Sequence, residues 1–243
     1  MSRQHTWGKA YSVAVAGQPN AGKSTTFNAL TGARQFVANY PGVTVEKRTG
    51  AFAYRGARIT LVDLPGTYSL TSYSLEERVA RDYLLDERPD VVLNVVDASN
   101  LERNLYLTFQ LLEMERPLVI ALNMMDIARG RGTAIDPEGL SEQLGVPVIP
   151  TVSNRGTGKH RLREVIWETC ANPPTRHAGF CVDYGGDLET AIARLERSIQ
   201  EDADLTKQCP SRWLAVKLLE GDPEAQRLLE GPVESRDYRL SGS

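Results

Sequence analysis

Cysteine, histidine and long apolar runs are scarce in this sequence, and each scarcity argues against one kind of site or segment. Only 3 cysteines and 3 histidines occur among 243 residues. The cysteines are widely spaced, form no C-x-x-C pair and cannot all pair with one another, so we expect a reducing environment rather than a disulfide framework. No group of histidine, cysteine and carboxylate residues has the spacing of a transition-metal site. We therefore expect no iron site in this segment.

Membrane-spanning and secretion segments are also missing. No run reaches the roughly eighteen apolar residues that a transmembrane helix needs, and the N-terminus MSRQHTWGKA lacks the apolar stretch of a secretion signal. The charge is nearly balanced, with 28 Lys and Arg against 31 Asp and Glu and a formal net charge of −3. Such a balance gives no general attraction to nucleic acid or to anionic lipid. The chain as given is expected to be soluble and to bind no nucleic acid.

What is present is a phosphate-binding pattern near the N-terminus. Residues 17–24 read GQPNAGKS, which fits G-x-x-x-x-G-K-[ST] between a short apolar run and a helical pattern. In such a loop, backbone N–H groups surround the phosphates of a nucleotide, the Lys23 amine meets the outer phosphates, and the Ser24 hydroxyl ligates Mg²⁺. The expected phosphate-binding residues are Gly17, Asn20, Ala21, Gly22, Lys23, Ser24 and Thr25.

Apolar strand candidates alternate with helical patterns over the first 170 residues. Strands are expected at 11–16, 58–63, 91–97, 118–123 and 146–151, and helices at 23–30, 74–85, 101–114, 137–144 and 159–170. This alternation predicts an α/β fold, a mostly parallel sheet with helices on both faces. Together with the phosphate loop above and the motifs below, it predicts the P-loop GTPase fold as the fold class. Segment 45–54 alternates and carries charge, so we expect it to be an exposed edge strand.

The pattern of apolar residues along the sequence changes after Cys170. The string NPP at 172–174 ends the last helix, and apolar residues then recur at helical spacing behind Asp187, an expected helix cap. A helical block is expected over about 175–232. The predicted domains are therefore 1–172, which binds the nucleotide, and 173–243, a C-terminal α-helical domain with a tail.

Two carboxylate motifs follow predicted strands. In D-x-x-G at 63–66, Asp63 can hold Mg²⁺ through water, and the Gly66 N–H can bind a γ-phosphate. In N-x-x-D at 123–126, the Asp126 carboxylate accepts the N1–H and exocyclic N2–H of guanine, whereas adenine offers neither donor. A further D-x-x-G at 183–186 follows no strand, and a further N-x-x-D at 94–97 has its asparagine inside a strand, so both are expected to be unrelated to the site.

Residues on three other segments complete the expected site. Ser153-Asn154-Arg155 would supply a backbone N–H to the guanine O6, with an ordinary serine–asparagine turn as the alternative. In the switch I segment, residues 39–46, the Thr44 hydroxyl can complete the Mg²⁺ shell when GTP is bound, with Thr31 and Thr49 as rivals. The other expected nucleotide contacts are Gly42, Val43, Asn123 and Met124.

The order of these motifs resembles the small-GTPase-like G domains. The strings GQPNAGKST, NYPGVTVEKRTG, DLPGTYSL, ALNMMD and RWLAVKLLEGD resemble, over residues 11–231, the cytosolic N-terminal region of the FeoB ferrous-iron transporter family. Met124 agrees with the guanine motif of that family, and Gln18 departs from the Asn often seen there. The resemblance implies a G domain, then a helical domain of the GDI-like or spacer type, attached to a membrane-spanning iron pathway at the cytoplasmic face of the bacterial inner membrane.

The residue after Gly66 is Thr67 and not the glutamine that orients water in Ras-type enzymes. The resemblance implies that Asn20 ligates a K⁺ ion beside the β- and γ-phosphates, with backbone carbonyls from 40–43, and that the ion neutralises charge developing there. A loop-stabilising role is the alternative for Asn20. The expected catalytic residues are Asn20, Lys23, Thr44 and Gly66.

Together these features predict a slow GTPase, with Mg²⁺ and K⁺ as cofactors, that regulates or drives ferrous-iron transport by an attached membrane region. Its switches would push on the helical block as the nucleotide changes. A nucleotide-sensing module with incidental hydrolysis is one alternative. A ribosome- or RNA-associated GTPase is another, disfavoured by the acidic charge balance. Association between copies of the chain is left open.

Overall fold

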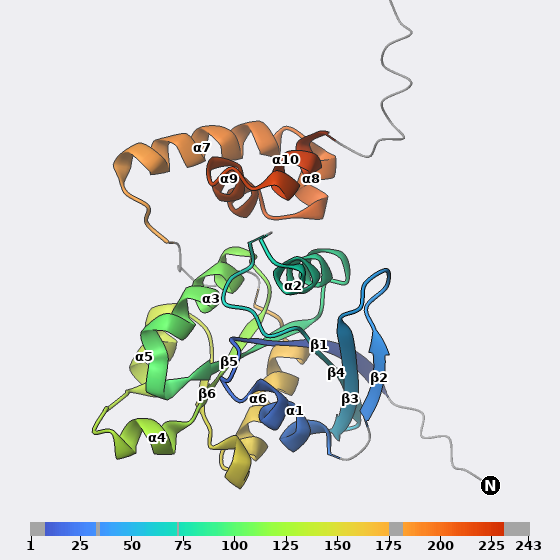
Figure 1. The fold of residues 1–243 in the computed structure, drawn as a ribbon, viewed down its shortest axis with the longest axis vertical. Coiled ribbons are helices and arrows are strands. Elements are labelled where there is room, and N and C mark those ends of the chain that lie inside the picture. Colours follow the sequence, from blue (N-terminus) through green and yellow to red (C-terminus); the bar gives the residue numbers. More distant parts are fainter. Residues whose placement is uncertain (1–7, 33–34, 72, 175–181, 231–243) are drawn as a thin grey trace, which may run out of the picture.

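A sheet with the strand order β2-β3-β4-β1-β5-β6-β7 organises the N-terminal two thirds of the chain (Figure 1). The structure is a computed structural model that describes residues 8–32, 35–71, 73–174 and 182–230. The strands are β1 (Lys9–Gly17), β2 (Gln35–Asn39), β3 (Glu46–Tyr54), β4 (Ala57–Asp63), β5 (Val91–Asp97), β6 (Leu118–Asn123) and β7 (Val148–Pro150). Pairing is parallel from β4 through β1, β5 and β6 to β7, and antiparallel between β2, β3 and β4.

Helices cover both faces of this sheet because successive side chains of each buried strand point to opposite sides. Val13 and Val15 of β1 pack in the core that includes α1 and α6, whereas Ala14 packs in the core that includes α2 and α3. The helices here are α1 (Lys23–Thr31), α2 (Leu75–Asp86), α3 (Leu101–Glu113), α4 (Met125–Gly130), α5 (Pro137–Leu144) and α6 (Lys159–Ala171), with the 3-10 turns η1 (Ala98–Asn100) and η2 (Ser153–Arg155). The predicted fold class is confirmed.

The predicted edge strand is wrong in its position. The segment expected at 45–54 forms β3, but β2 pairs with its outer side, so β3 lies inside the sheet. All five residues of β2 are exposed, including Phe36 and Val37. Such a short, fully exposed strand carries no alternating apolar pattern, which is why the sequence did not indicate it. At the opposite edge, β7 is shorter than the predicted strand 146–151.

Four helices make up the C-terminal block among the described residues: α7 (Gly186–Gln200), α8 (Ala203–Gln208), α9 (Ser211–Leu219) and α10 (Pro223–Glu230). The predicted helical block is present, while residues 175–181 and the predicted tail after 230 lie outside the described ranges. The expected cap at Asp187 is wrong. Gly185 stands at the N-cap with φ 88°, and Asp187 lies in the first turn of α7, where its charge favours the positive end of the helix dipole.

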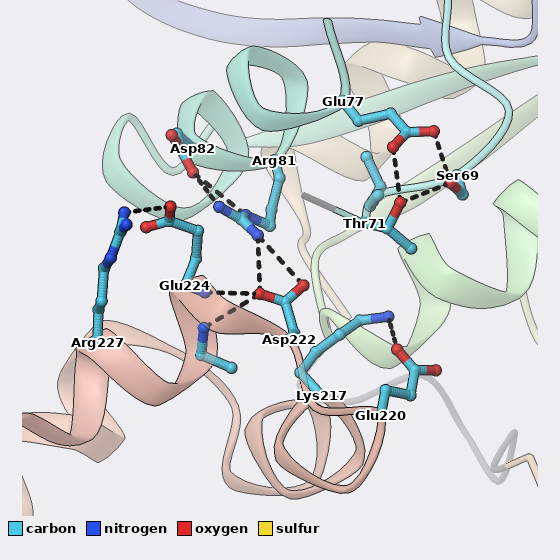
Figure 2. A network of polar contacts seen from close by, with 12 residues as sticks. Ser69, Thr71, Glu77, Arg81, Asp82, Lys217, Glu220, Asp222, Glu224 and Arg227 are labelled. Atoms are coloured by element: carbon cyan, nitrogen blue, oxygen red, sulfur yellow. Dashed lines mark hydrogen bonds and ion pairs between the residues drawn. The ribbon is translucent and has the colours of Figure 1, made fainter. Parts of the chain in front are cut away.

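The helical block rests on α2 and α3 (Figure 1). Trp213 of α9 is 1% exposed and belongs to the same apolar core as side chains of α2 and α3. A buried ion pair adds to this contact, since the Arg81 guanidinium of α2 lies 3.5 Å from the Asp222 carboxylate (Figure 2). The same carboxylate accepts the Glu224 N–H at 2.9 Å and so caps α10. Of the helices in the described ranges, none is long and apolar enough to span a membrane.

Candidate nucleotide-binding site

The phosphate-loop motif lies where β1 ends and α1 begins, as its spacing predicts. A Cβ at Gly17 would lie 2.7 Å from the Val95 carbonyl oxygen, so the loop leaves the sheet at a point where no side chain fits. Gly22 precedes α1 with φ 86°, and a Cβ there would lie 2.2 Å from Asn123 Nδ2. Asn20, which is exposed, also has a left-handed φ of 68°. The loop therefore wraps around the N-terminus of α1, whose backbone N–H groups suit an anion.

The lysine expected to meet the phosphates and the aspartate expected to hold Mg²⁺ contact each other directly. Lys23 Nζ donates a hydrogen bond to Asp63 Oδ1, and the two side chains are only 11% and 9% exposed. They meet because β1 and β4 are parallel neighbours whose carboxyl ends share one edge of the sheet. The amine can exchange the carboxylate for a phosphate, which frees the carboxylate for a cation.

Switch I forms the hairpin loop between β2 and β3. Tyr40 N–H donates to the Val45 carbonyl oxygen at 2.9 Å, and Val43 N–H donates to the Tyr40 carbonyl oxygen at 3.3 Å. Pro41 and Gly42, with φ 73° at Gly42, are the central residues of this type II turn. The loop is thus folded on itself beside α2 (Figure 1).

Thr44 is exposed in this loop, while both rival threonines are engaged elsewhere. Thr31 is buried and donates to the Phe27 carbonyl oxygen at 2.8 Å inside α1. Thr49 lies in β3, where its hydroxyl is 3.5 Å from the Phe36 carbonyl oxygen. Of the three, Thr44 is the hydroxyl that remains available to a ligand, and its role stays a prediction.

The sequence reasoning missed the part played by the Tyr40 side chain. Its ring is 6% exposed, and its hydroxyl donates to the backbone carbonyl oxygen of Asp63 at 3.1 Å. Burial raises the pKa of this hydroxyl, so it stays a neutral donor. The available signal was an aromatic residue directly before Pro-Gly in the switch I loop. Switch I is thereby attached to the strand end that carries Asp63.

The loop between β4 and α2, which we call switch II, is held at both ends. Thr67 is 4% exposed, and its N–H donates to the Gly17 carbonyl oxygen of the phosphate loop at 3.3 Å. At the other end, the Glu77 carboxylate accepts the hydroxyls of Ser69 at 2.7 Å and Thr71 at 2.6 Å, as Figure 2 shows. Glu77 also forms a capping box with Ser74 at the start of α2. Switch II and α2 are therefore one connected unit.

The expected base-binding residues converge through Asn123. This side chain is buried at the end of β6, where its Nδ2 donates to the Ala21 carbonyl oxygen at 3.0 Å. Its Oδ1 accepts the Ser153 N–H at 3.0 Å and faces the Thr151 hydroxyl at 3.3 Å. The Ser153 hydroxyl lies 2.8 Å from that of Thr26 in α1. One amide thus joins the phosphate loop to the Ser-Asn-Arg turn, which forms η2.

Asp126 lies at the start of α4, next to the Ser-Asn-Arg turn. Met124 adopts a left-handed φ of 60°, and α4 begins directly after it, with Asp126 in its first turn. The Asp126 carboxylate is 28% exposed and lies 3.6 Å from the guanidinium of Arg155, which is 71% exposed. A pair so open to solvent is weak, so a ligand can displace it. Asn154 is exposed beside it.

The two further copies of the motifs, at 94–97 and 183–186, have structural partners. Asn94 is buried inside β5 and donates to the Thr108 hydroxyl at 2.7 Å, and Asp97 caps η1 by accepting the Ser99 N–H. Asp183 accepts the Gly185 N–H at 2.9 Å in the turn before α7. Within the ranges that the structure describes, no group of three or more His, Cys, Asp or Glu side chains is placed to hold a metal ion.

A sheet of this order, with a phosphate loop after β1 and N-x-x-D after β6, defines the class: a P-loop protein with the GTPase fold, extended by a helical domain. Two family profiles agree with this class. One, described as "Ferrous iron transport protein B", matches residues 11–166, and the other, "FeoB cytosolic helical domain", matches residues 184–239. The chain belongs to the ferrous iron transport protein B (FeoB) family, which confirms the resemblance seen in the sequence.

Individual relatives support the same assignment. The chain is 44% identical over 240 residues to an Fe(2+) transport protein A/Fe(2+) transporter FeoB fusion protein of Porphyromonas gingivalis, covering 96% of this chain and 28% of that protein. It is 46% identical over 237 residues to the Fe(2+) transporter FeoB of Salmonella typhimurium, covering 96% and 30%. The chain therefore spans less than a third of these relatives.

A solved structure matches over nearly the whole chain. The cytosolic domain of T. maritima FeoB in its GDP form II superposes with a TM-score of 0.85 at 42% identity, covering 95% of this chain and 91% of that one. The same domain in its GMPPNP form gives a TM-score of 0.84.

The close approach at Gly22 leads to a stability prediction. Gly22→Ala forces a side chain into a left-handed backbone and against Asn123, so we expect the ligand-free protein to lose about 1–3 kcal/mol of unfolding free energy in urea titrations. Gly186→Ala is the matched control, because a Cβ there meets nothing within 4 Å, and it should change stability by less than about 0.5 kcal/mol. Equal stability of the two variants would contradict the packing described here.

Proposed function

We propose that this chain binds and hydrolyses GTP, and that its nucleotide state regulates or drives Fe²⁺ transport by a membrane region of the full-length protein. The observation that carries the proposal is the joint placement of phosphate and base groups. Lys23 and Asp63 meet at one end of the sheet, and Asn123 ties the same loop to the Ser153 turn. The GDP and GMPPNP forms of the T. maritima domain support a guanine nucleotide as the ligand.

The residues present fit a triphosphate with Mg²⁺. Ser24 is exposed beside Lys23, and its hydroxyl and the Asp63 carboxylate are the hard oxygen donors that Mg²⁺ prefers. When bound, this ion would neutralise phosphate charge. Lys23 would then donate to the outer phosphates, Gly66 would donate its N–H to the γ-phosphate, and Thr44 would turn inward from its exposed position. Asn20 would offer its side-chain oxygen to K⁺.

Base selection would rest on Asp126. Its carboxylate would accept two hydrogen bonds from guanine. The turn formed by residues 153–155 lies close by, because Asn123 holds the Ser153 N–H and Arg155 contacts Asp126. To reach the base, Asp126 exchanges its contact with Arg155 for one with the ligand. This exchange costs little, because that pair is solvent-exposed.

The signal would leave the site through α2. Glu77 fixes switch II to the start of this helix, and Arg81 one turn later contacts Asp222 of the helical block (Figure 2). A movement of switch II on loss of the γ-phosphate would therefore displace the block. Coupling to iron transport would require a membrane region of the full-length protein, outside the part of the relatives that this chain covers.

A nucleotide-sensing module with incidental hydrolysis is the second candidate, favoured by one observation. Thr67 occupies the position after Gly66, and its backbone N–H is engaged with Gly17. No glutamine stands there to orient water, so fast turnover has no side-chain basis at this position.

Calorimetry tests nucleotide binding directly. The protein should take up GDP and GTP, and Lys23→Ala should weaken GTP binding at least tenfold, because it removes charge-assisted hydrogen bonds to phosphate, which typically contribute about 1.5–3 kcal/mol. Lys207→Ala, at an exposed lysine of the helical block, should bind like the wild type. Uptake of neither nucleotide by folded wild-type protein would end the proposal.

Asp126→Asn tests base selection. An amide donor suits the C2 carbonyl of xanthine, so this variant should prefer XTP over GTP in competition titrations. Asp97→Asn is the control, since Asp97 only caps η1, and it should keep the preference for GTP. A variant at Asp126 that still selects GTP would show that another group reads the base.

Phosphate release in different salts separates the hydrolase from the sensor. We expect GTP turnover in KCl to exceed that in NaCl at equal ionic strength, because the smaller Na⁺ fits the proposed site less well. Asn20→Ala should abolish this difference while retaining GDP binding. Equal trace rates in both salts for the wild type would favour the sensing module.

A further inference from the structure

Two tyrosines and a lysine connect switch I to α2. Tyr40 of switch I and Tyr83 of α2 have ring centroids 6.0 Å apart at an interplanar angle of 81°, an edge-on contact. Lys47 of β3 places its Nζ 5.4 Å from the Tyr40 centroid and 5.2 Å from the Tyr83 centroid. We call these three residues the aromatic latch. They come from three different elements, so the latch fixes the relative positions of the loop, the strand and the helix.

The contacts within the latch are favourable on physical grounds. Edge-on tyrosine pairs match the positive edge of one ring with the negative face of the other, and an ammonium group near both rings adds a cation–π attraction. Tyr40 is almost completely buried, and burial raises the pKa of Tyr83 to about 12. The strand pairing of Ala38 with Lys47 holds the lysine at the base of the loop.

The latch stabilises one particular form of switch I. In this form the Tyr40 carbonyl oxygen accepts the Val43 N–H, and Thr44 is exposed. Because Thr44 is exposed and the loop closes on itself, we expect the loop to leave this hairpin form when Thr44 binds a metal beside Asp63. GDP lacks the γ-phosphate that would draw Thr44 inward, so GDP can bind while switch I keeps its hairpin form. A contact present in only one form lowers the affinity of any ligand that requires the other form.

We propose that Tyr83 and Lys47 are positioning residues that hold switch I on α2 through the ring of Tyr40, and thereby lower the affinity for GTP relative to GDP. This inference rests on the proposed binding of guanine nucleotides. It adds a specificity determinant outside the nucleotide site, since neither residue belongs to the phosphate, metal or base motifs. Tyr83 lies two residues after Arg81, so the helix that holds switch I also contacts the helical block.

Nucleotide affinities provide the first test. Tyr83→Leu keeps an apolar side chain but removes the ring, and Lys47→Met keeps the aliphatic stem but removes the charge. We expect the ratio of affinities for a non-hydrolysable GTP analogue and for GDP to rise about three- to tenfold in Tyr83→Leu and about twofold to threefold in Lys47→Met, the range of such aromatic and cation–π contacts. Tyr106→Leu is the matched control, at a 55% exposed tyrosine of α3, and should leave the ratio unchanged.

Proteolysis provides a second test that does not depend on nucleotide. Trypsin cleaves after Lys47 and Arg48, which follow switch I directly, and Arg48 remains a cleavage site in Lys47→Met. We expect ligand-free Tyr83→Leu to be cut after these residues several times faster than the wild type or Tyr106→Leu. Mass spectrometry of the early fragments locates the cut.

The outcomes separate the latch from the proposed function. A folded Tyr83→Leu protein with wild-type GDP affinity, an unchanged affinity ratio and an unchanged cleavage rate would overturn the latch. If the wild type binds neither nucleotide, the proposed function fails, and the inference on nucleotide preference fails with it, whatever the cleavage rate. If Tyr83→Leu does not fold, Lys47→Met decides, because its substitution lies at a partly exposed side chain.

Discussion

The buried amide of Asn123 is the contact on which the candidate site depends. Its two ends bind the Ala21 carbonyl oxygen and the Ser153 N–H, so one side chain fixes the distance between the loop for phosphates and the turn for the base. Gly22 must lack a Cβ because this amide occupies the space. Replacing either end of the amide would leave a buried polar group without its partner, which costs more than the hydrogen bond gains. The rest of the site follows from strands that end at the same edge of the sheet.

Much of this arrangement could be predicted because it depends on short-range chemistry. The glycine spacing of the phosphate loop and the carboxylates at strand tips are local patterns. The apolar runs at 91–97 and 118–123 predicted the bounds of β5 and β6 correctly. What failed left no recognisable pattern in the sequence. Strand β2 is fully exposed and has no alternating apolar residues, although it pairs with β3. The role of Tyr40 depends on the carbonyl oxygen of Asp63, twenty-three positions away. The contacts of the site residues with a nucleotide stay predictions.

Helix α2 unites the parts of the molecule that would respond to a nucleotide. Its first turn carries the Glu77 carboxylate that orders switch II, its middle carries Arg81 against the helical block, and its last turns carry Tyr83 against switch I. A rigid helix of 12 residues transmits a displacement at one end to the other. The two switches and the helical block therefore share one mechanical element and cannot move independently while these contacts persist.

Asp222 performs two tasks with one carboxylate: it starts α10 and it neutralises the buried Arg81. Because Oδ1 takes part in both, a substitution that removes this oxygen would weaken the contact between the two parts of the molecule and the start of α10 together. A change that weakens this contact but preserves the start of α10 would act on Arg81, on the surrounding apolar surface, or on the charge of residue 222 while keeping its oxygen acceptor. The shared oxygen thus links the stability of α10 to the strength of the contact between the helical block and α2.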